Sequence, residues 1–287
     1  MRLAFSVWAQ YLLPHRLLAT LIYHIARCTW PAVKNPLIRW FTAHYVVDLN
    51  EAEKSDAESY ESFNAFFTRR LKLNSRPIAG DEHTVISPVD GYLTQFGTVC
   101  EGKLIQAKGM GYQINELLGE LQGEATSLMM GSYATLYLAP NHYHRVHLPL
   151  AGTLNRTRYI PGKRFSVNQH TVSAVPQLFC RNERAVCWFD TTIGTLAMVL
   201  VGALNVSSIS TKWLGEIASD KPKVWYNSTP QRRYERGQEI GQFNLGSTVI
   251  LILPPERLIW RRELQSGQRI NMGEALGELS SETGAHM

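Results

Sequence analysis

The stretch Leu245-Gly-Ser-Thr-Val-Ile-Leu-Ile-Leu253 places a glycine–serine step directly before an unbroken apolar run. Such a run, rich in Val, Ile and Leu, predicts a β-strand that begins at about Thr248. The step itself has an ordinary interpretation as a turn. It also has a chemical one, because glycine leaves the carbonyl before Ser247 unshielded and tolerates strained backbone angles. The Ser247 hydroxyl can attack that carbonyl if a base and an oxyanion stabiliser lie beside it.

Strand-like sequence continues outward from this stretch across most of the chain. Segments rich in Val, Ile, Leu, Tyr and Thr, punctuated by Gly, Pro, Asn and Asp, are 92–99, 127–138, 185–189 and 194–206. One clear helix is expected at 113–121, and a hairpin with glycine turns at 267–273. The sequence therefore predicts an α+β fold with a mostly β catalytic body, barrel-like or sandwich-like, and amphipathic helices at the N-terminus.

The composition is that of a folded chain with a basic N-terminus. The chain has 287 residues, of which 45% are hydrophobic and 18% charged, and this excludes disordered, collagen-like and coiled-coil classes. Its formal net charge is +5, and residues 1–47 alone match that charge because they contain no Asp or Glu. Their basic and Trp residues are Arg2, Trp8, Arg16, Arg27, Trp30, Lys34, Arg39 and Trp40.

This N-terminal region is too interrupted to cross a membrane. A spanning helix needs about 20 apolar residues, whereas the longest charge-free run, 3–15, contains Pro14. The apolar residues of 17–25 instead share one helical face, and a second helix is expected to begin at Asn35-Pro36. Basic amphipathic helices with Trp are typical of segments in the interface of an anionic membrane. Helices packed on a soluble body are the alternative, and no nucleic-acid-binding motif accompanies the charge.

Residues 48–75 connect this region to the β-rich part. Ser55-Asp-Ala-Glu58 fits a capping box at a helix start. The aromatic stripe that includes Phe63-Asn-Ala-Phe-Phe67 is expected to pack in a core. The chain thus divides into a helical, membrane-associating region at 1–75 and a β-rich catalytic domain at 76–287.

A second candidate for chemistry is the histidine-rich segment that ends in Tyr143-His-Arg-Val-His147. Together with His142 it holds three of the nine histidines, and histidine suits proton transfer near neutral pH. Surface or core histidines are the ordinary alternative, and a zinc site is a weak one because no HExxH motif occurs. The four cysteines form no CxxC pair, so we expect free thiols in a reducing compartment. A third candidate, Asp90, either forms an Asp-Gly turn or orients a histidine.

Seven segments in the order of the chain carry a family resemblance. They are Phe63-Asn-Ala-Phe66-Phe67, Pro88-Val-Asp90-Gly91, Gln106-Ala-Lys108-Gly109, Tyr143-His144-Arg145-Val-His147, Phe165-Ser166-Val-Asn168, Arg181-Asn-Glu-Arg184 and Leu245-Gly246-Ser247-Thr248. Together they resemble the pyruvoyl-dependent phosphatidylserine decarboxylases of bacteria. The tetrapeptide LGST combined with YHRxH is specific to that family, and the resemblance covers most of residues 5–253.

The resemblance implies that the chain is a proenzyme that cuts itself between Gly246 and Ser247. His147, held by Asp90, would remove the Ser247 proton. Ser247 Oγ would then attack the Gly246 carbonyl and give an ester, and β-elimination would separate the two chains. The residue left at position 247 would become a pyruvoyl group. The β and α chains would span 1–246 and 247–287.

The same resemblance implies decarboxylation of a lipid on that pyruvoyl group, which acts as an electron sink without PLP and without a metal. The amine of phosphatidylserine would form a Schiff base with it, carbon dioxide would leave, and phosphatidylethanolamine would be released. His144 is implied as the proton donor, and Ser166 as a weaker candidate for holding the substrate. A homodimer attached peripherally to the cytoplasmic side of the cell membrane is implied as well.

Two other functions fit some of the same residues. Asp90, His147 and Ser247 also suit the triad of a serine hydrolase, although the G-x-S-x-G elbow is absent. A non-enzymatic membrane module with a carrier-like β body is the other alternative, but it lacks a modifiable Lys in a tight turn. The spacing leaves one point open, since His144 and His147 would face opposite ways in a strand and the same way in a helical turn.

Overall fold

The computed structural model describes residues 10–11, 14–107, 109–120, 125–204, 208–217, 221–226 and 232–280. Several expected features lie outside these residues: Arg2, Trp8, Lys108, the end of a helix at Leu121, the end of a strand at Val206 and the tail beyond Ser280. In the described part of the chain, no helix is both long enough and apolar enough to cross a membrane.

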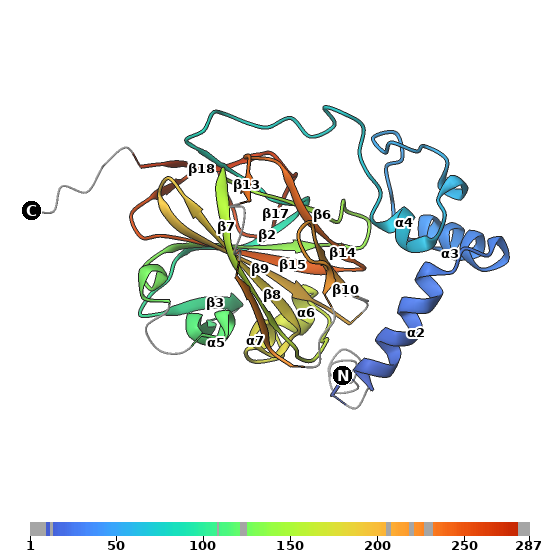
Figure 1. Cartoon of the computed structure of the whole chain (residues 1–287), viewed down its shortest axis with the longest axis horizontal. Coiled ribbons are helices and arrows are strands. Elements are labelled where there is room, and N and C mark those ends of the chain that lie inside the picture. Colours follow the sequence, from blue (N-terminus) through green and yellow to red (C-terminus); the bar gives the residue numbers. More distant parts are fainter. Residues whose placement is uncertain are drawn as a thin grey trace, which may run out of the picture.

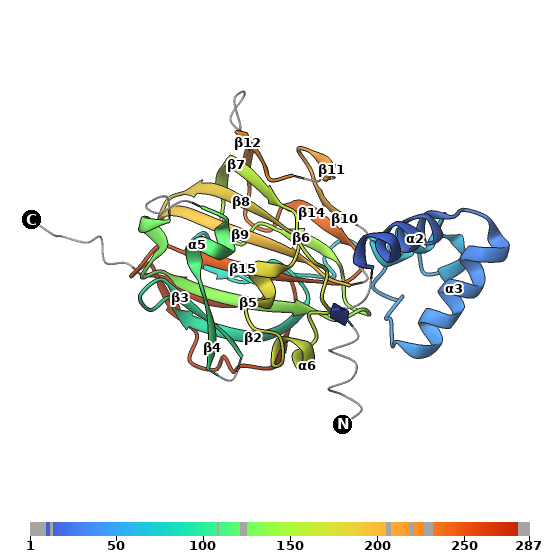
Figure 2. The same cartoon turned by 90° about the horizontal axis from the view of Figure 1, so that it is seen from below.

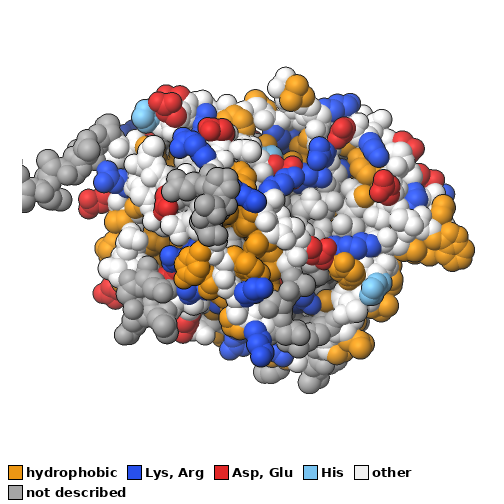
Figure 3. All heavy atoms as spheres, viewed as in Figure 1, with side chains coloured by type: hydrophobic (Ala, Val, Ile, Leu, Met, Phe, Trp, Pro, Cys, Tyr) orange, Lys and Arg blue, Asp and Glu red, His pale blue; other side chains and the backbone are white. Residues whose placement is uncertain are grey.

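The N-terminal helices form a layer beside the β-rich body (Figures 1 and 2). They are α2 (His15–Arg27), α3 (Pro31–His44), the 3-10 helix η1 (Ala57–Ser59) and α4 (Phe63–Phe67). Apolar side chains are visible on the surface at this end of the molecule (Figure 3). The exposed ones on α2, at the residue before α3 and on α3 itself include Leu17, Leu21, Ile25, Trp30 and Trp40.

Two helix starts differ from those expected. Helix α3 begins at Pro31 after an extended Trp30, so Pro36 lies inside the helix and does not start it. Pro31 fits the first helical position because its missing N–H would have no partner there. In the connector, the Asp56 side chain accepts a hydrogen bond from the Glu58 N–H, so Asp56 caps the short helix in place of the expected Ser55.

The aromatic stripe of α4 packs in a core, as expected. Ser62 caps this helix by accepting a hydrogen bond from the Ala65 N–H at 3.1 Å. Phe66 and Phe67 are buried against Phe41 of α3, with ring centroids 5.9 Å apart in each case. Leu245 belongs to the same apolar cluster. The helical layer is therefore joined to the residue that precedes the glycine–serine step.

Among the described residues, the strands form a nine-stranded sheet in the order β12-β7-β8-β9-β15-β5-β2-β17, with β13 also paired to β7. These strands are β2 (Gly91–Thr98), β5 (Ser132–Leu138), β7 (Gly152–Ile160), β8 (Arg184–Thr191), β9 (Gly194–Gly202), β12 (Lys223–Tyr226), β13 (Arg233–Tyr234), β15 (Ser247–Leu253) and β17 (Gln268–Ile270). Smaller sheets contain β1 (Thr84–Ile86), β3 (Lys103–Ala107), β4 (Met110–Gln113), β6 (Arg145–His147), β10 (Ser208–Thr211), β11 (Gly215–Ile217), β14 (Glu239–Asn244), β16 (Leu258–Trp260) and β18 (Ala275–Leu279). The remaining helices are α5 (Ile114–Leu118), η2 (Thr126–Leu128), α6 (Gln169–Val172) and α7 (Leu178–Arg181).

Strand β15 lies at the centre of the large sheet, between β5 and β9. Its side chains alternate between two cores: Val249 and Leu251 belong to one cluster, Ile250 and Ile252 to the other. Burial on both faces explains why the sequence is apolar without interruption. The strand expected at Thr248–Leu253 is thus confirmed, with one more residue at its start.

The α+β class with a β-rich body and N-terminal helices is confirmed, but the large sheet does not close into a barrel. The hairpin expected at 267–273 is wrong, since β17 pairs with β2 whereas β18 pairs with β1 and β16. The division at residues 75 and 76 stays a prediction. All four cysteines are free.

Candidate active site

Ser247 is the first residue of β15 and lies opposite Leu138 of β5 and Gly202 of β9. It is fully buried, and its Oγ has no hydrogen-bond partner. Immediately before it, Leu245 and Gly246 have φ angles of +83° and +62°. A bulky residue such as Leu is strained at positive φ, by about 1–3 kcal/mol. The bond between Gly246 and Ser247 therefore joins a tight, strained turn to a strand that is paired on both sides.

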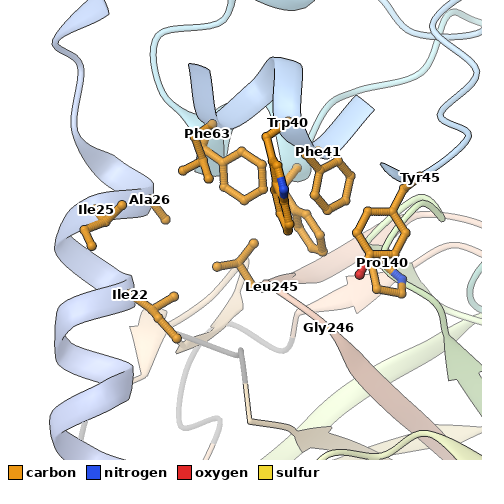
Figure 4. A pocket seen from close by; sticks show the side chains of 12 residues that line it. Ile22, Ile25, Ala26, Trp40, Phe41, Tyr45, Phe63, Pro140, Leu245 and Gly246 are labelled. Carbon is orange, nitrogen blue, oxygen red and sulfur yellow. The ribbon is translucent and has the colours of Figure 1, made fainter. Parts of the chain in front are cut away.

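An apolar cavity of about 230 Å³ opens beside this bond (Figure 4). Ile22 and Ile25 of α2 and Trp40 of α3 face into it across from Leu245. The remaining lining residues are Ala26, Leu37, Phe41, Tyr45, Phe63, Phe67, Pro140 and Gly246. The helical layer thus covers the glycine–serine step with an apolar pocket.

A second, more polar cavity of about 330 Å³ contains Ser247 itself in its wall. Ser166 and Asn168, from the loop between β7 and α6, lie in the same wall. Its other lining residues are Tyr45, Tyr137, Leu138, Pro140, Val167, Ala203, Leu204 and Gly246. The structure therefore brings Ser166 and Ser247 to one cavity, and Tyr45, Pro140 and Gly246 are shared with the apolar cavity.

Asp90 lies just before β2 and is only 2% exposed. Its carboxylate is held by Arg76 through two hydrogen bonds, of 2.9 and 2.5 Å, and by the Met272 N–H at 2.8 Å. The other side of the Arg76 guanidinium binds both carboxylate oxygens of Glu51. Burial lowers the pKa of Arg76, but the hydrogen bonds with Asp90 and Glu51 outweigh burial and raise it. Arg76 and Glu51, which sequence reasoning missed, thus fix Asp90.

His147 ends β6 and has partners at both ring nitrogens. Its Nδ1 is 2.7 Å from the Gly237 carbonyl, to which it donates, so that Nε2 accepts a hydrogen bond of 2.9 Å from the Tyr143 hydroxyl. Its backbone N–H donates to the Pro88 carbonyl at 2.9 Å, which places it beside the segment of Asp90. Burial lowers the pKa of His147, whereas its bond to Gly237, the charge of Glu239 and, less strongly, the charge of Asp90 raise it.

His144 is fully buried, with its ring 4.0 Å from that of Phe67. Its Nδ1 lies 2.8 Å from the His142 carbonyl, so Nδ1 carries the hydrogen and Nε2 carries the lone pair. This Nε2 has no hydrogen-bond partner. Burial lowers the pKa of His144 to about 3, so the ring is neutral at pH 7. Its carbonyl accepts from the Phe243 N–H, four residues before Ser247.

The residues of the expected triad are not joined by hydrogen bonds. Among the described residues, no hydrogen bond joins Asp90 to His147, or Ser247 to either His144 or His147. The two histidines have different partners, and no group of three or more metal-binding side chains comes together in the described ranges. Tyr143, within the histidine-rich segment itself, is the further site residue that the sequence pointed to without assigning a role.

Comparison with known proteins identifies the family. The phosphatidylserine decarboxylase profile matches residues 63–278, and a second profile, described as PSD, matches residues 5–46. The phosphatidylserine decarboxylase proenzyme of Pseudomonas fluorescens is 47% identical over 274 residues, which cover 94% of this chain and 95% of that protein. The proenzyme of Ectopseudomonas mendocina is 46% identical over 276 residues, 94% and 96% of the two chains. This confirms the resemblance inferred from the glycine–serine and histidine segments: the chain belongs to the phosphatidylserine decarboxylase family.

Proposed function

We propose that this chain is a phosphatidylserine decarboxylase proenzyme that cuts itself between Gly246 and Ser247. The observation that carries the proposal is the position of Ser247, whose buried hydroxyl lacks a partner directly after two residues at positive φ. Ser247 lines the more polar cavity, and the apolar cavity lies beside it; this pair of cavities supports a lipid substrate. Relatives named as proenzymes over nearly the whole chain support the cleavage.

We assign the cleavage base to His147 and its electrostatic support to Asp90. The Nδ1 hydrogen bond to Gly237 leaves the lone pair of His147 on Nε2. That lone pair now accepts from the Tyr143 hydroxyl, so this hydrogen bond must open before Ser247 can transfer its proton. The charge of Asp90 adds to the larger effect of Glu239 in favouring the protonated ring that results. The open space around Gly246, where an added Cβ would meet no atom within 4 Å, leaves its carbonyl approachable.

The residues present fit a pyruvoyl group at position 247. Ser247 lines a cavity large enough for a small head group, and its Oγ has no hydrogen-bond partner among the described residues. A pyruvoyl group supplies the electron sink that decarboxylation of an amino acid needs. His144 Nε2, which is unprotonated at neutral pH, can take up a proton within the buried site and return it to the substrate carbon.

The two cavities suggest how the lipid lies. We assign the acyl chains to the apolar cavity, which Trp40 and Leu245 line, and the serine head group to the cavity of Ser166 and Ser247. The exposed apolar face of α2 then lies at the membrane surface, consistent with a peripheral protein at the cytoplasmic side of the cell membrane. Pairing of two copies follows from the family resemblance alone and is proposed on that basis.

Mass measurement of the purified Ser247→Ala protein tests the proposal. We expect one intact chain, whereas the unmodified protein gives two chains, the smaller of 41 residues (287 minus 246). Thr248→Val is the matched control, because Thr248 also carries a buried hydroxyl without a partner and should not affect cleavage. Two chains from Ser247→Ala would show that the cleavage site is wrong.

The same measurement separates the two histidines. We expect His147→Ala to stay a single chain. His144→Ala should instead yield two chains but release carbon dioxide from phosphatidylserine at least about 100-fold more slowly, since a positioned proton-transfer group contributes about that much. Normal turnover by processed His144→Ala would remove His144 from the reaction.

A further inference from the structure

The loop that carries Ser166 is held from two sides. It runs from the end of β7 at Ile160 to the start of α6 at Gln169 and contains no strand of its own. On its inner side, the side-chain amide of the buried Asn182 makes two hydrogen bonds with the backbone of Phe165. Its oxygen accepts from the Phe165 N–H at 2.9 Å, and its nitrogen donates to the Phe165 carbonyl at 2.8 Å. The same amide donates to the carbonyl of Gly202, the residue opposite Ser247 in the sheet. The inner side is thus tied to the strand beside the reacting position.

On its outer side, the loop is held by the N-terminal segment. The Gln10 side chain accepts a hydrogen bond from the Ser166 N–H at 2.9 Å, across 156 residues of sequence. The neighbouring Tyr11 ring lies 4.9 Å from the Phe165 ring, and its hydroxyl accepts from Arg181 at 3.4 Å. Gln10 is only 8% exposed, so this contact is partly shielded from water. Two consecutive residues of the loop, Phe165 and Ser166, therefore contact two consecutive residues of the N-terminal segment, one through its ring and the other through its backbone N–H.

We infer that Gln10 and Tyr11 are positioning residues for the substrate head group, an inference that rests on the proposed function. They touch no reacting atom. They act through Ser166, which lines the cavity of Ser247. Without Gln10, the Ser166 N–H loses its partner, and the outer wall of the head-group cavity is free to move away from Ser247. The segment that precedes the membrane-facing helix α2 would thereby complete the cavity for an anionic phosphoserine group.

Steady-state kinetics on the full-length, processed protein test the inference. The substrate is a short-chain phosphatidylserine below its micellar concentration, so that membrane docking does not contribute. Gln10→Ala should cleave itself normally and raise KM about three- to tenfold, the effect of one lost hydrogen bond, with kcat changed less than about twofold. Gln268→Ala is the matched control, because its side chain likewise accepts from a backbone N–H, that of Gln265, away from the Ser247 cavity.

A second pair of variants tests the same inference in case Gln10→Ala fails to fold. Tyr11→Phe keeps the ring against Phe165 and should retain the unmodified KM, whereas Tyr11→Ala should raise it. Amide hydrogen exchange of the peptide that contains Ser166 should quicken in Gln10→Ala, with no change in β15. Unchanged KM in both Gln10→Ala and Tyr11→Ala would overturn the inference, as would unchanged exchange at Ser166. If the unmodified protein releases no carbon dioxide from phosphatidylserine, the proposed function fails instead, and the exchange result still decides whether Gln10 holds the loop.

Discussion

His142 and His144 belong to one buried turn, and burial lowers their pKa values to about 4 and about 3. In the unfolded chain their pKa returns to about 6.5, so between that pH and the folded values only the unfolded chain binds the protons. The contribution of these two histidines to the free energy of unfolding is therefore fully present above about pH 6.5 and is lost as the pH drops toward 4. Each histidine contributes a slope of about 1.4 kcal/mol per pH unit in this window.

Urea unfolding of the uncleaved Ser247→Ala protein at pH 7 and pH 5 measures this slope. We expect His144→Gln, made in that background, to remove one histidine's share of the loss. His83→Gln is the control and should keep the full slope, since the His83 side chain is 67% exposed. An unchanged slope in His144→Gln would contradict the assignment of a buried neutral ring.

Arg76 gives a second prediction about a single residue. Replacing it with Met leaves the buried Asp90 carboxylate without its cation, and breaking such a pair costs about 3–5 kcal/mol. The free energy of unfolding of Ser247→Ala should fall by about that amount in the Arg76→Met variant. Arg233→Met is the control and should change it by less than about 0.5 kcal/mol, because the Arg233–Glu235 pair is exposed. Adding Asp90→Asn to Arg76→Met should recover part of the loss, and no recovery would argue against an unpaired buried charge as the cause.

Site residues that stand in short sequence motifs could be predicted, whereas residues whose role depends on the fold could not. Gly246, Ser247 and His147 stand in short motifs whose chemistry is visible locally. Arg76 stands in no motif, because its role depends on the folded chain bringing Glu51 and Asp90 to the two sides of one guanidinium. The spacing of the residues likewise could not predict that Asp90 and His147 form no direct hydrogen bond.

Among elements, strands with strong apolar patterns were predictable and those without were not. Strand β15 is apolar throughout because both of its faces are buried, and its position was found within one residue. Strand β7 was missed, since it carries Asn155, Arg156 and Arg158 among its apolar residues and one of its faces is half-exposed. The start of α3 was misplaced because the sequence offers two prolines, and only the fold decides which one is first.

Helix α2 carries a prediction about docking. Its Leu17 and Leu21 side chains are 69% and 55% exposed, which is costly in water and favourable in a membrane interface. The Leu17→Ser/Leu21→Ser protein should bind vesicles that contain phosphatidylserine at least about tenfold more weakly, given about 1.5–3 kcal/mol for each leucine. A vesicle-sedimentation assay measures this binding. Ile259→Ser, at a 64% exposed residue of β16, is the control and should bind normally; equal losses in both proteins would reject α2 as the docking element.

At the scale of the whole molecule, the proposed cut separates the chain without separating the fold. Residues 247–287 contribute β15 to the centre of the large sheet, where it pairs along its length with β5 and β9. All seven residues of β15 are buried. The smaller chain therefore has most of its contacts with the larger one, and its release would expose an apolar strand to water.

We therefore expect the processed protein to elute as one species in size-exclusion chromatography in native buffer. It should elute at the same volume as the uncleaved Ser247→Ala protein, and its two chains should separate only in denaturant. A free small chain in native buffer would show that β15 is not held as the pairing indicates.

The turn of Leu245 and Gly246 has one more consequence, which concerns the order of folding and self-cleavage. The bond that follows them leads directly into a strand that is paired on both sides, so the proposed cleavage geometry would require that pairing to be formed. On the proposed mechanism, a nascent or misfolded chain would lack that geometry and would keep its serine unmodified. The reactive carbonyl would then arise only in molecules that have already folded. The pyruvoyl group would therefore be found only in molecules that had folded correctly before they matured.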